Sequence, residues 1–324
     1  MTIRKLLLAS LAVMLLLGTP AVEAEKETNA NSPFTDITDH WAQKEIEQLY
    51  AGGAIKDNGS GLFRPNDPIT RGELAALFLR AKGITPVKAP VSHFADVPLD
   101  SWLSPYVETA YRLGFFHGRE EEGKLAFHPE QPIERQEMID VVLRASGEIG
   151  RADALKWSTA YQILLPYPDQ QDVKTWHQKA VAYALLNKIA SPYQDGTLKP
   201  TKLMTRAEAA IFAYHNLLTD GHQALPRLGD LKIPYKQVMT VQTTSYAETN
   251  VKAFLGWPLR EGIVAVDPKV IPLGTHLYIE GYGYAVAADI GSAVKEKHVD
   301  VFLPSLQAAL AYGRQKDTKV YILD

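Results

Sequence analysis

The stretch FTDITDHWAQKEIEQLYAGGAI (residues 34–55) opens a pattern that the chain uses three times. Its counterparts are HFADVPLDSWLSPYVETAYRLGFF (93–116) and YPDQQDVKTWHQKAVAYALLNKI (167–189). In each copy an aspartate precedes a tryptophan by five to seven residues, and an amphipathic helical stretch follows the tryptophan. Three copies with this regular spacing indicate one supersecondary unit that occurs three times.

The second half of each unit is a turn that leads to a helix start. The helix starts read ITRGE (69–73), IERQE (133–137) and MTRAE (204–208). In the first and third, a threonine stands three residues before a glutamate, which is the pattern of a capping box that satisfies free backbone N–H groups. The tryptophan and the helix-start arginine are 30, 33 and 30 residues apart in the three units.

The arginines and the tryptophans of the units each allow two interpretations. Arg71, Arg135 and Arg206 occupy the first helical position, where a cation opposes the helix dipole. Each arginine either binds an anion together with the positive helix end, or pairs with a carboxylate inside the protein. Each tryptophan is either a core residue, which the sequence favours, or a flat surface that stacks on a sugar ring.

The three units resemble S-layer homology (SLH) domains, at 34–83, 93–147 and 166–219. The resemblance is carried by the F-x-D…W start, the G-x-F-x-P turn and the I-T-R-x-E helix start. It implies a pseudo-threefold α-helical bundle that binds secondary cell-wall polysaccharide, with the arginines on acidic sugars. Two departures are Glu134 in place of a helix-start threonine and Leu198 in place of the turn aromatic. The candidate polysaccharide-binding residues are Asp36, Trp41, Arg71, Asp96, Trp102, Arg135, Asp169, Trp176 and Arg206.

Residues 1–24 predict a secretory signal peptide. Arg4 and Lys5 precede an apolar run of 12 residues, and small residues offer a cleavage site before Glu25. The alternative is an uncleaved anchor, although a membrane span needs about 20 residues. We therefore expect an exported protein at the cell wall or cell surface, without a stable membrane span after cleavage.

The composition excludes several classes of protein. The 324 residues include no cysteine, which excludes a disulfide scaffold, a cysteine nucleophile and a zinc–thiolate site. The net charge of −3 and the lack of basic blocks argue against a nucleic-acid partner.

The chain changes character after the third unit. Residues 220–238 contain two prolines and two glycines without a helical period, and we interpret them as a linker. Residues 239–324 contain short runs that are rich in β-branched and aromatic residues, separated by glycines and prolines. Short strands in a segment of this size predict a small closed barrel.

Three aspartates of this last segment stand in sequence that favours strands. Asp267, Asp289 and Asp300 each follow or interrupt an apolar run, where aspartate is disfavoured. One interpretation is a catalytic cluster in which at least one carboxyl has a raised pKa. A second is the capping of turns, which fits Asp267 best. A third is a carboxylate metal site near His298.

Residues 240–324 resemble the 3D domain, named for three aspartates, of bacterial peptidoglycan-cleaving proteins. The match runs through GIVAVDPKVIPLGTHLYIEGYGYAVAADIGSAVKEKHVDVF. It implies a double-psi β-barrel and cleavage between N-acetylmuramic acid (MurNAc) and N-acetylglucosamine (GlcNAc), leaving a 1,6-anhydro end. We expect Asp300 to be the acid because of its apolar flanks, Asp289 to orient the sugar and Asp267 to support the barrel. Further substrate-binding candidates are Thr244, Tyr246 and Lys295.

The barrel also departs from the family pattern. Ser292 and Glu296 stand where the family has glycines, and Trp257 is either a sugar platform or a core residue. The sequence as a whole predicts a multidomain protein, mostly an α-helical pseudo-threefold SLH bundle with a small C-terminal double-psi β-barrel. We expect a secreted, wall-anchored lytic transglycosylase that needs no cofactor and no metal. The alternatives are a non-catalytic wall- or S-layer-binding protein with a degenerate barrel, and a signalling or germination factor.

Overall fold

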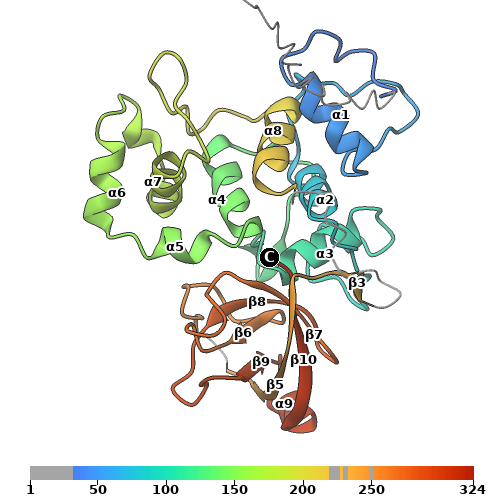
Figure 1. Cartoon of the computed structure of the whole chain (residues 1–324), viewed down its shortest axis with the longest axis vertical. Helices are drawn as coiled ribbons and strands as arrows, with labels where there is room; N and C mark the ends of the chain where they lie inside the picture. The colour runs from blue at the N-terminus through green and yellow to red at the C-terminus, as the bar shows by residue number, and fades with distance from the viewer. Residues whose placement is uncertain (1–31, 219–226, 229–232, 249–250) are drawn as a thin grey trace, which may run out of the picture. The chain divides into compact units, whose positions relative to one another are not determined.

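The computed structural model describes residues 32–218, 227–228, 233–248 and 251–324, so the predicted signal peptide lies outside the described residues. Helix accounts for 31% and strand for 19% of the described residues. The prediction of a mostly α-helical architecture is therefore wrong, and the repeat region is not a helical bundle. Its helices are short, and irregular segments separate them (Figure 1).

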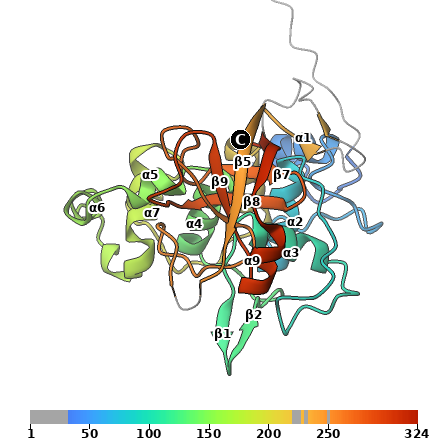
Figure 2. The same cartoon turned by 90° about the horizontal axis from the view of Figure 1, so that it is seen from below.

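The repeat region consists of short helices and one β-hairpin. The hairpin, of β1 (Arg119–Glu121) and β2 (Lys124–Ala126), is antiparallel and is clearly visible in Figure 2. None of the described helices is long and apolar enough to cross a lipid bilayer. The elements are α1 (Gln43–Ala51), α2 (Arg71–Ala81), α3 (Ser104–Arg112), β1 (Arg119–Glu121), β2 (Lys124–Ala126), α4 (Arg135–Ala145), α5 (Ile149–Asp153), α6 (Trp157–Leu164), the 3₁₀ helices η1 (Gln170–Asp172) and η2 (Thr175–His177), α7 (Gln178–Leu186) and α8 (Arg206–Asn216).

The helices are short because the sequence stops them. After each of the first four helices, the chain reaches within two residues a glycine with a left-handed backbone, a conformation that ends α-helices. These glycines are Gly53, Gly83, Gly114 and Gly147, with φ between 66° and 79°. After α7 the left-handed residue is Lys188, with φ 59°. The amphipathic stretches after the tryptophans thus form helices of only nine residues, α1, α3 and α7.

The three repeats join through backbone hydrogen bonds in a ring. The N–H of Ile69 donates to the carbonyl of Met204, that of Met204 to Ile133, and that of Ile133 to Ile69, at 3.0 to 3.2 Å. The first turns of α2, α4 and α8 therefore meet at one place. Each helix-start arginine adds a backbone bond to another repeat, from Arg71 to Gln131, from Arg135 to Lys202 and from Arg206 to Asp67.

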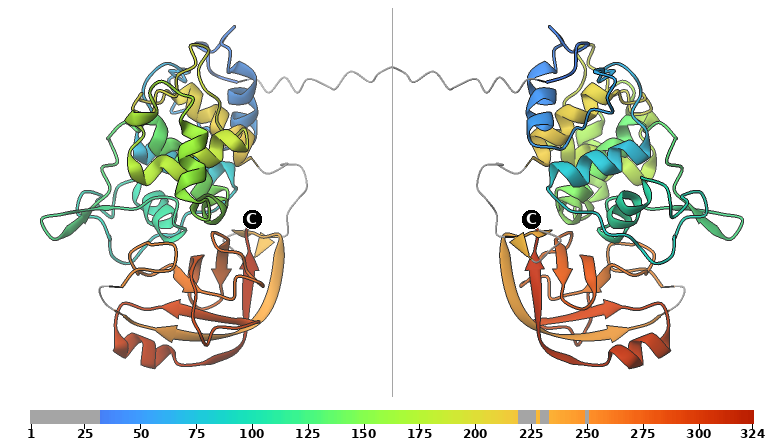
Figure 3. Two further views of the ribbon diagram at one scale, coloured as in Figure 1. Left: turned by 90° about the vertical axis from the view of Figure 1, so that its left-hand side faces the viewer. Right: turned by 90° about the vertical axis from the view of Figure 1, so that its right-hand side faces the viewer.

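The C-terminal strands form a closed barrel in the order β10-β5-β9-β6-β8-β7 (Figure 3). The pairs β5–β9 and β6–β8 are parallel, and the other pairs in the barrel are antiparallel. Alternate residues of each strand fill the interior, which is built largely from valine, leucine, isoleucine and alanine. The strands are β5 (Gln237–Tyr246), β6 (Ile263–Ala265), β7 (His276–Ile279), β8 (Gly283–Asp289), β9 (His298–Phe302) and β10 (Gln315–Ile322), with helix α9 (Leu306–Tyr312) before the last.

The predicted linker contains a short antiparallel pair. Strand β3 (Arg227–Leu228) pairs with β4 (Ile233–Pro234), and Ile233 is buried. Residues 219–226 and 229–232 of this segment lie outside the described residues. The barrel begins with β5, directly after β4.

Candidate functional site

Four side chains lie side by side on four neighbouring strands of the barrel. Thr244 on β5 is in register with Asp300 on β9, and Asp300 with Ala265 on β6. A register shift in the β6–β8 pair places Asp289, rather than Ala288, opposite Ala265. Residues directly opposite one another on paired strands share a face of the sheet. The two valines that flank Asp300 are fully buried in the barrel interior, so the row of Thr244, Asp300, Ala265 and Asp289 faces outward.

The Asp300 carboxyl is half-buried in this row. Its Oδ1 accepts a hydrogen bond of 2.6 Å from the Thr244 hydroxyl, and no other hydrogen bond to this carboxyl comes from the described residues. Burial raises the pKa of Asp300, and the negative charges of Asp289 and Glu248 add to this effect. The bond from Thr244 and the nearby His298 oppose it. Asp300 therefore holds a proton at higher pH than an ordinary aspartate.

The Asp289 carboxylate is held by two donors. Its Oδ2 accepts a hydrogen bond of 3.0 Å from the Tyr246 hydroxyl, and its Oδ1 accepts one of 2.9 Å from the backbone N–H of Phe254. Burial and the charge of Asp289 raise the pKa of Tyr246 well above its usual value, so this tyrosine remains a donor. Sequence reasoning missed Phe254, because a backbone N–H leaves no signal in the residue type.

Asp267, the third aspartate, holds a turn. Its carboxylate accepts hydrogen bonds from the backbone N–H groups of Lys269 (3.0 Å) and Glu296 (2.9 Å), which hold its pKa below the ordinary value. This matches the turn-capping interpretation. Glu296 has φ 54°, a left-handed conformation in which a glycine is unstrained.

The remaining barrel candidates are not part of the row. Lys295 and Ser292 are exposed, and Ser292 does not have a left-handed backbone. Trp257 is only 5% exposed, so it is a core residue and the sugar-platform interpretation is wrong. The described residues include no group of three or more histidines, aspartates and glutamates placed to hold a metal ion.

Three grooves in the repeat region each combine an arginine, a glutamate and a tryptophan from three different repeats. The tryptophans are 59% to 72% exposed, so the core interpretation, which the sequence favoured, is wrong. Trp41 and Trp102 lie in the turns before α1 and α3, and Trp176 lies in η2, directly before α7. The three sets are Arg206, Glu73 and Trp102; Arg135, Glu208 and Trp41; and Arg71, Glu137 and Trp176.

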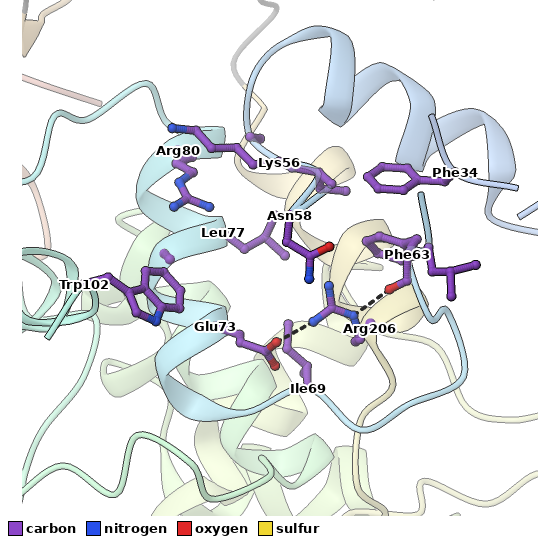
Figure 4. Close-up of a pocket in the computed structure, with 14 residues that line it drawn as sticks. Phe34, Lys56, Asn58, Phe63, Ile69, Glu73, Leu77, Arg80, Trp102 and Arg206 are labelled. Carbon is purple, nitrogen blue, oxygen red and sulfur yellow. Dashed lines mark hydrogen bonds and ion pairs between the residues drawn. The ribbon is translucent and has the colours of Figure 1, made fainter. Parts of the chain in front are cut away.

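The groove of Trp102 is the most basic of the three in its immediate lining. Arg206 forms an ion pair of 2.6 Å with Glu73, and Figure 4 shows this pair opposite Trp102. Lys56 and Arg80 line the same groove, which has a volume of about 220 Å³. The pair confirms the interpretation of an internal salt bridge for Arg206, and it leaves two further cations in the lining.

The groove of Trp41 contains an arginine without a carboxylate partner among the described residues. Arg135 donates a hydrogen bond of 2.7 Å to the carbonyl of Ser191, and its guanidinium lies 4.7 Å from the ring centroid of Tyr193. Glu208, the equivalent of the glutamates that pair in the other grooves, instead binds Lys202 at 2.5 Å. The positive charge of Arg135 therefore faces a groove of about 490 Å³.

The groove of Trp176 contains the most deeply buried arginine. Arg71 is 2% exposed, forms an ion pair with Glu137 and donates to the carbonyls of Phe127 and His117. Burial and the nearby Arg119 lower the pKa of Arg71 to about 10. This guanidinium has its donors engaged by the protein itself.

Glu134, the departure in the second repeat, also lines the groove of Trp176. Its carboxylate binds Lys174 at 2.9 Å. Burial raises the pKa of Glu134, but hydrogen bonds from Lys174 and Gln136 outweigh burial and lower it overall. This groove therefore carries an additional ionised carboxylate.

The three repeat aspartates bind backbone groups. Asp36 accepts hydrogen bonds from the N–H groups of Phe63 (2.8 Å) and Arg64 (2.7 Å), one on each oxygen. In each repeat the second donor residue has a left-handed backbone, with φ between 46° and 59°. These carboxylates hold the turn before the proline, and their oxygens are occupied. The equivalent bonds run to Asp96 from Phe127 and His128, and to Asp169 from Leu198 and Lys199.

Comparison with protein families agrees with the two resemblances. The S-layer homology domain matches residues 33–75, 93–139 and 166–210, and the 3D domain matches residues 262–324. The chain therefore carries three SLH domains and a C-terminal 3D domain.

Two of the similar proteins have names that refer to the bacterial cell wall or S-layer. The putative cell wall shaping protein YabE of Bacillus subtilis (strain 168) is 42% identical over 96 residues, which is 27% of this chain and 23% of that protein. An S-layer protein of Bacillus licheniformis is 27% identical over 205 residues, 63% of this chain and 22% of that protein. The E. coli lytic transglycosylase MltA aligns with 22% of this chain and 27% of its own, at 27% identity and a TM-score of 0.20.

The chain matches about a quarter of the length of each of these relatives. The three SLH domains, together with the S-layer relatives, indicate a cell-surface protein that is anchored to the cell wall.

Proposed function

We propose that this protein is a wall-anchored enzyme that cleaves peptidoglycan glycan strands, as a lytic transglycosylase that leaves 1,6-anhydroMurNAc ends. The observation that carries the proposal is the outward-facing row in which the protonatable Asp300 is in register, through Ala265, with Asp289. The 3D domain and the similarity to a putative cell wall shaping protein support peptidoglycan as the substrate.

The reaction starts from protonated Asp300. Its carboxylic acid gives its proton to the glycosidic oxygen between MurNAc and GlcNAc while the bond from that oxygen to C1 of MurNAc breaks. The GlcNAc side leaves as an alcohol, and positive charge develops at C1. The C6 hydroxyl of the same MurNAc attacks C1, and its proton passes to the Asp300 carboxylate. The acid is regenerated, the 1,6-anhydro bond is formed, and no water is consumed.

Asp289 supports this step by charge and by position. Its carboxylate is fixed by Tyr246 and the Phe254 N–H, so it does not need to reorganise during the reaction. A fixed negative charge on the same face stabilises the positive charge at C1 and accepts hydrogen bonds from sugar hydroxyls. A hydrolase would need a second carboxylate to activate water, whereas the internal C6 hydroxyl makes this unnecessary.

The repeat region anchors the enzyme by binding secondary cell-wall polysaccharide in the SLH grooves. An exposed tryptophan stacks on a sugar ring, and an arginine charge beside it receives an acidic group. The grooves of Trp41 and Trp102 suit this role, because one has an arginine without a carboxylate partner among the described residues and the other has extra cations. Anchoring holds the barrel near its substrate, so a modest catalytic rate suffices.

The experiment that tests the enzyme is digestion of intact peptidoglycan with mass spectrometry of the soluble products. The purified mature protein is compared with Asp300→Asn and with Asp317→Asn. Asp317 is a matched control because it lies on β10, outside the row, and because asparagine tolerates the left-handed backbone of this position. We expect anhydromuramic products from the parent and the control, and none from Asp300→Asn. Products with reducing ends would show a hydrolase. No products from the parent, with wall binding retained, would show a binding protein with a degenerate barrel.

A further inference from the structure

The proposed reaction leaves one titratable side chain next to the row unused. His298 begins β9, two residues before Asp300 and on the same face of the strand. Its Nε2 lies 2.8 Å from the Thr244 hydroxyl oxygen, and the same oxygen lies 2.6 Å from Asp300 Oδ1. One hydroxyl thus connects an imidazole to the proposed catalytic acid, across the parallel pair β5–β9.

We propose that His298 is a positioning residue that exchanges a proton with Asp300 through the Thr244 hydroxyl. The inference rests on the proposed function, because it concerns the protonation state in which the acid of that reaction meets its substrate. His298 and Asp300 are both partly exposed, and the contact is formed by side chains of adjacent strands in fixed register.

The hydrogen-bond directions show how the exchange works. A hydroxyl carries one hydrogen, so Thr244 donates to only one of its two neighbours at a time. When Asp300 is ionised, Thr244 donates to the carboxylate and accepts from the imidazolium Nε2–H. The proton on Nε2 then moves to the threonine oxygen while the threonine proton moves to Asp300 Oδ1. The carboxylic acid now donates to Thr244, and Thr244 donates to the bare Nε2.

The exchange balances in atoms and charge. The imidazolium becomes a neutral imidazole, the carboxylate becomes a neutral acid, and the hydroxyl ends with one hydrogen as it began. No oxidant, metal or additional molecule takes part.

The surroundings explain why such a connection is useful. The titratable groups that face Asp300 are Asp289 on β8, Glu248 and Tyr246 on or after β5, and His298 on its own strand. Asp289 and Glu248 favour the protonated acid, whereas His298 and the Thr244 bond favour the carboxylate. The reaction needs both forms in turn, and a connection that stabilises each of them prevents either from being trapped.

The test is a double-mutant cycle that is read by carbon-13 NMR of the Asp300 carboxyl in the full mature chain. The variants are His298→Leu, Thr244→Val and the double variant, with Thr244→Ser as the conservative control that keeps the hydroxyl. The Asp300 signal is assigned by its loss in Asp300→Asn. We expect His298→Leu to raise the Asp300 titration midpoint more in the parent and in Thr244→Ser than in Thr244→Val, because valine leaves only the through-space charge of His298 to be lost.

The cycle separates the relay from a simple charge effect. If His298 acts only as a charge through space, its removal shifts the midpoint equally with valine or threonine at position 244, and that outcome overturns the proposal. An unchanged midpoint in His298→Leu overturns it as well. Thermal unfolding of each variant verifies that the barrel folds, and the isosteric valine is favourable in a strand.

The pH dependence of activity gives a second test, which separates failure of the proposed function from failure of the proton exchange. Because the acid must be protonated to start the reaction, the upper pH limit of anhydro-product release should move up with the midpoint in His298→Leu. A purely structural role for His298 would lower the activity at every pH by the same factor. If the parent releases no product, the proposed function fails, while the NMR cycle still decides whether the relay exists.

Discussion

Replacement of Asp36 distinguishes a structural carboxylate from a sugar ligand. In Asp36→Ala the N–H groups of Phe63 and Arg64 lose their acceptors, which lie at 2.8 and 2.7 Å. A hydrogen bond to a charged group contributes about 1.5–3 kcal/mol. Because Asp36 is half-buried, we take the lower value for each bond and expect a loss of about 3 kcal/mol in the free energy of unfolding.

Asp36→Asn provides the graded comparison. Its amide keeps one carbonyl oxygen, so one of the two N–H groups retains an acceptor and the expected loss is about 1.5 kcal/mol. The assay is chemical and thermal unfolding of the mature protein, with binding of purified wall polysaccharide measured on the same samples below the transition. Asp100→Ala is the control, since this exposed aspartate of the second repeat makes no side-chain bond to a described residue.

The result that would refute the reasoning is a change in binding without a change in stability. If both Asp36 variants unfold like the parent and yet lose the polysaccharide, the carboxylate is a ligand, as the family resemblance implies. If stability falls in the order parent, asparagine and alanine, and folded protein still binds, Asp36 maintains the turn that carries the groove.

Three further predictions concern other parts of the chain. Trp102→Ala should weaken polysaccharide binding about tenfold, about 1.4 kcal/mol, and Trp176→Ala by less, because the Trp176 groove carries the additional ionised carboxylate of Glu134; sedimentation with purified polysaccharide measures both. Glu296→Gly should raise the free energy of unfolding by about 1 kcal/mol by relieving a left-handed backbone, whereas Ser292→Gly should not, and urea unfolding compares them. Burial raises the pKa of Asp153 from 3.8 to about 6, so its folded pKa exceeds its unfolded one and stability is lost as pH rises through that window. Asp153→Asn should therefore have a free energy of unfolding about 1–2 kcal/mol higher than that of the parent at pH 7, but not at pH 3.5. Urea unfolding at the two pH values measures this, and a variant that is no more stable than the parent at pH 7 would contradict it.

Local signals in the sequence were reliable guides to local structure. Thr70 and Glu73 form the predicted capping box at the start of α2, and Thr205 and Glu208 form one at the start of α8. The bonds of such a box run between residues three apart, so the sequence contains everything that they require. The row of barrel residues could also be approached from sequence, since strand-like runs with single aspartates identify Asp289 and Asp300.

Features that depend on distant partners could not be predicted in this way. The third repeat lacks a turn aromatic at Leu198, yet Tyr193 supplies a ring at 4.7 Å from the Arg135 guanidinium. The phenylalanines of the other two turns lie 5.0 Å from their arginines. Tyr193 stands five residues before Leu198, outside the motif, so only the folded chain reveals the substitution.

The prediction of a mostly α-helical bundle is wrong for a related reason. Helical periodicity after each tryptophan indicates that a helix forms but not where it ends. A left-handed residue two positions after each of these helices, Gly53, Gly114 or Lys188, confines it to a short segment. The repeats are joined instead by backbone bonds between irregular segments, such as that from Met204 to Ile133. Backbone bonds of this kind involve no particular residue type, so the sequence pattern does not record them.

The ring of backbone bonds among Ile69, Met204 and Ile133 has an evolutionary consequence. The arginine, the glutamate and the tryptophan of every groove come from three different repeats, so the loss of a single repeat would remove a component from all three grooves and break the ring as well. Repeats of this type cannot be gained or lost one at a time, as the units of an open solenoid can. Diversification is left to point substitutions, and the three arginines of one ring already have different surroundings: an ion pair with Glu73 for Arg206, an ion pair with Glu137 for Arg71, and no carboxylate partner among the described residues for Arg135.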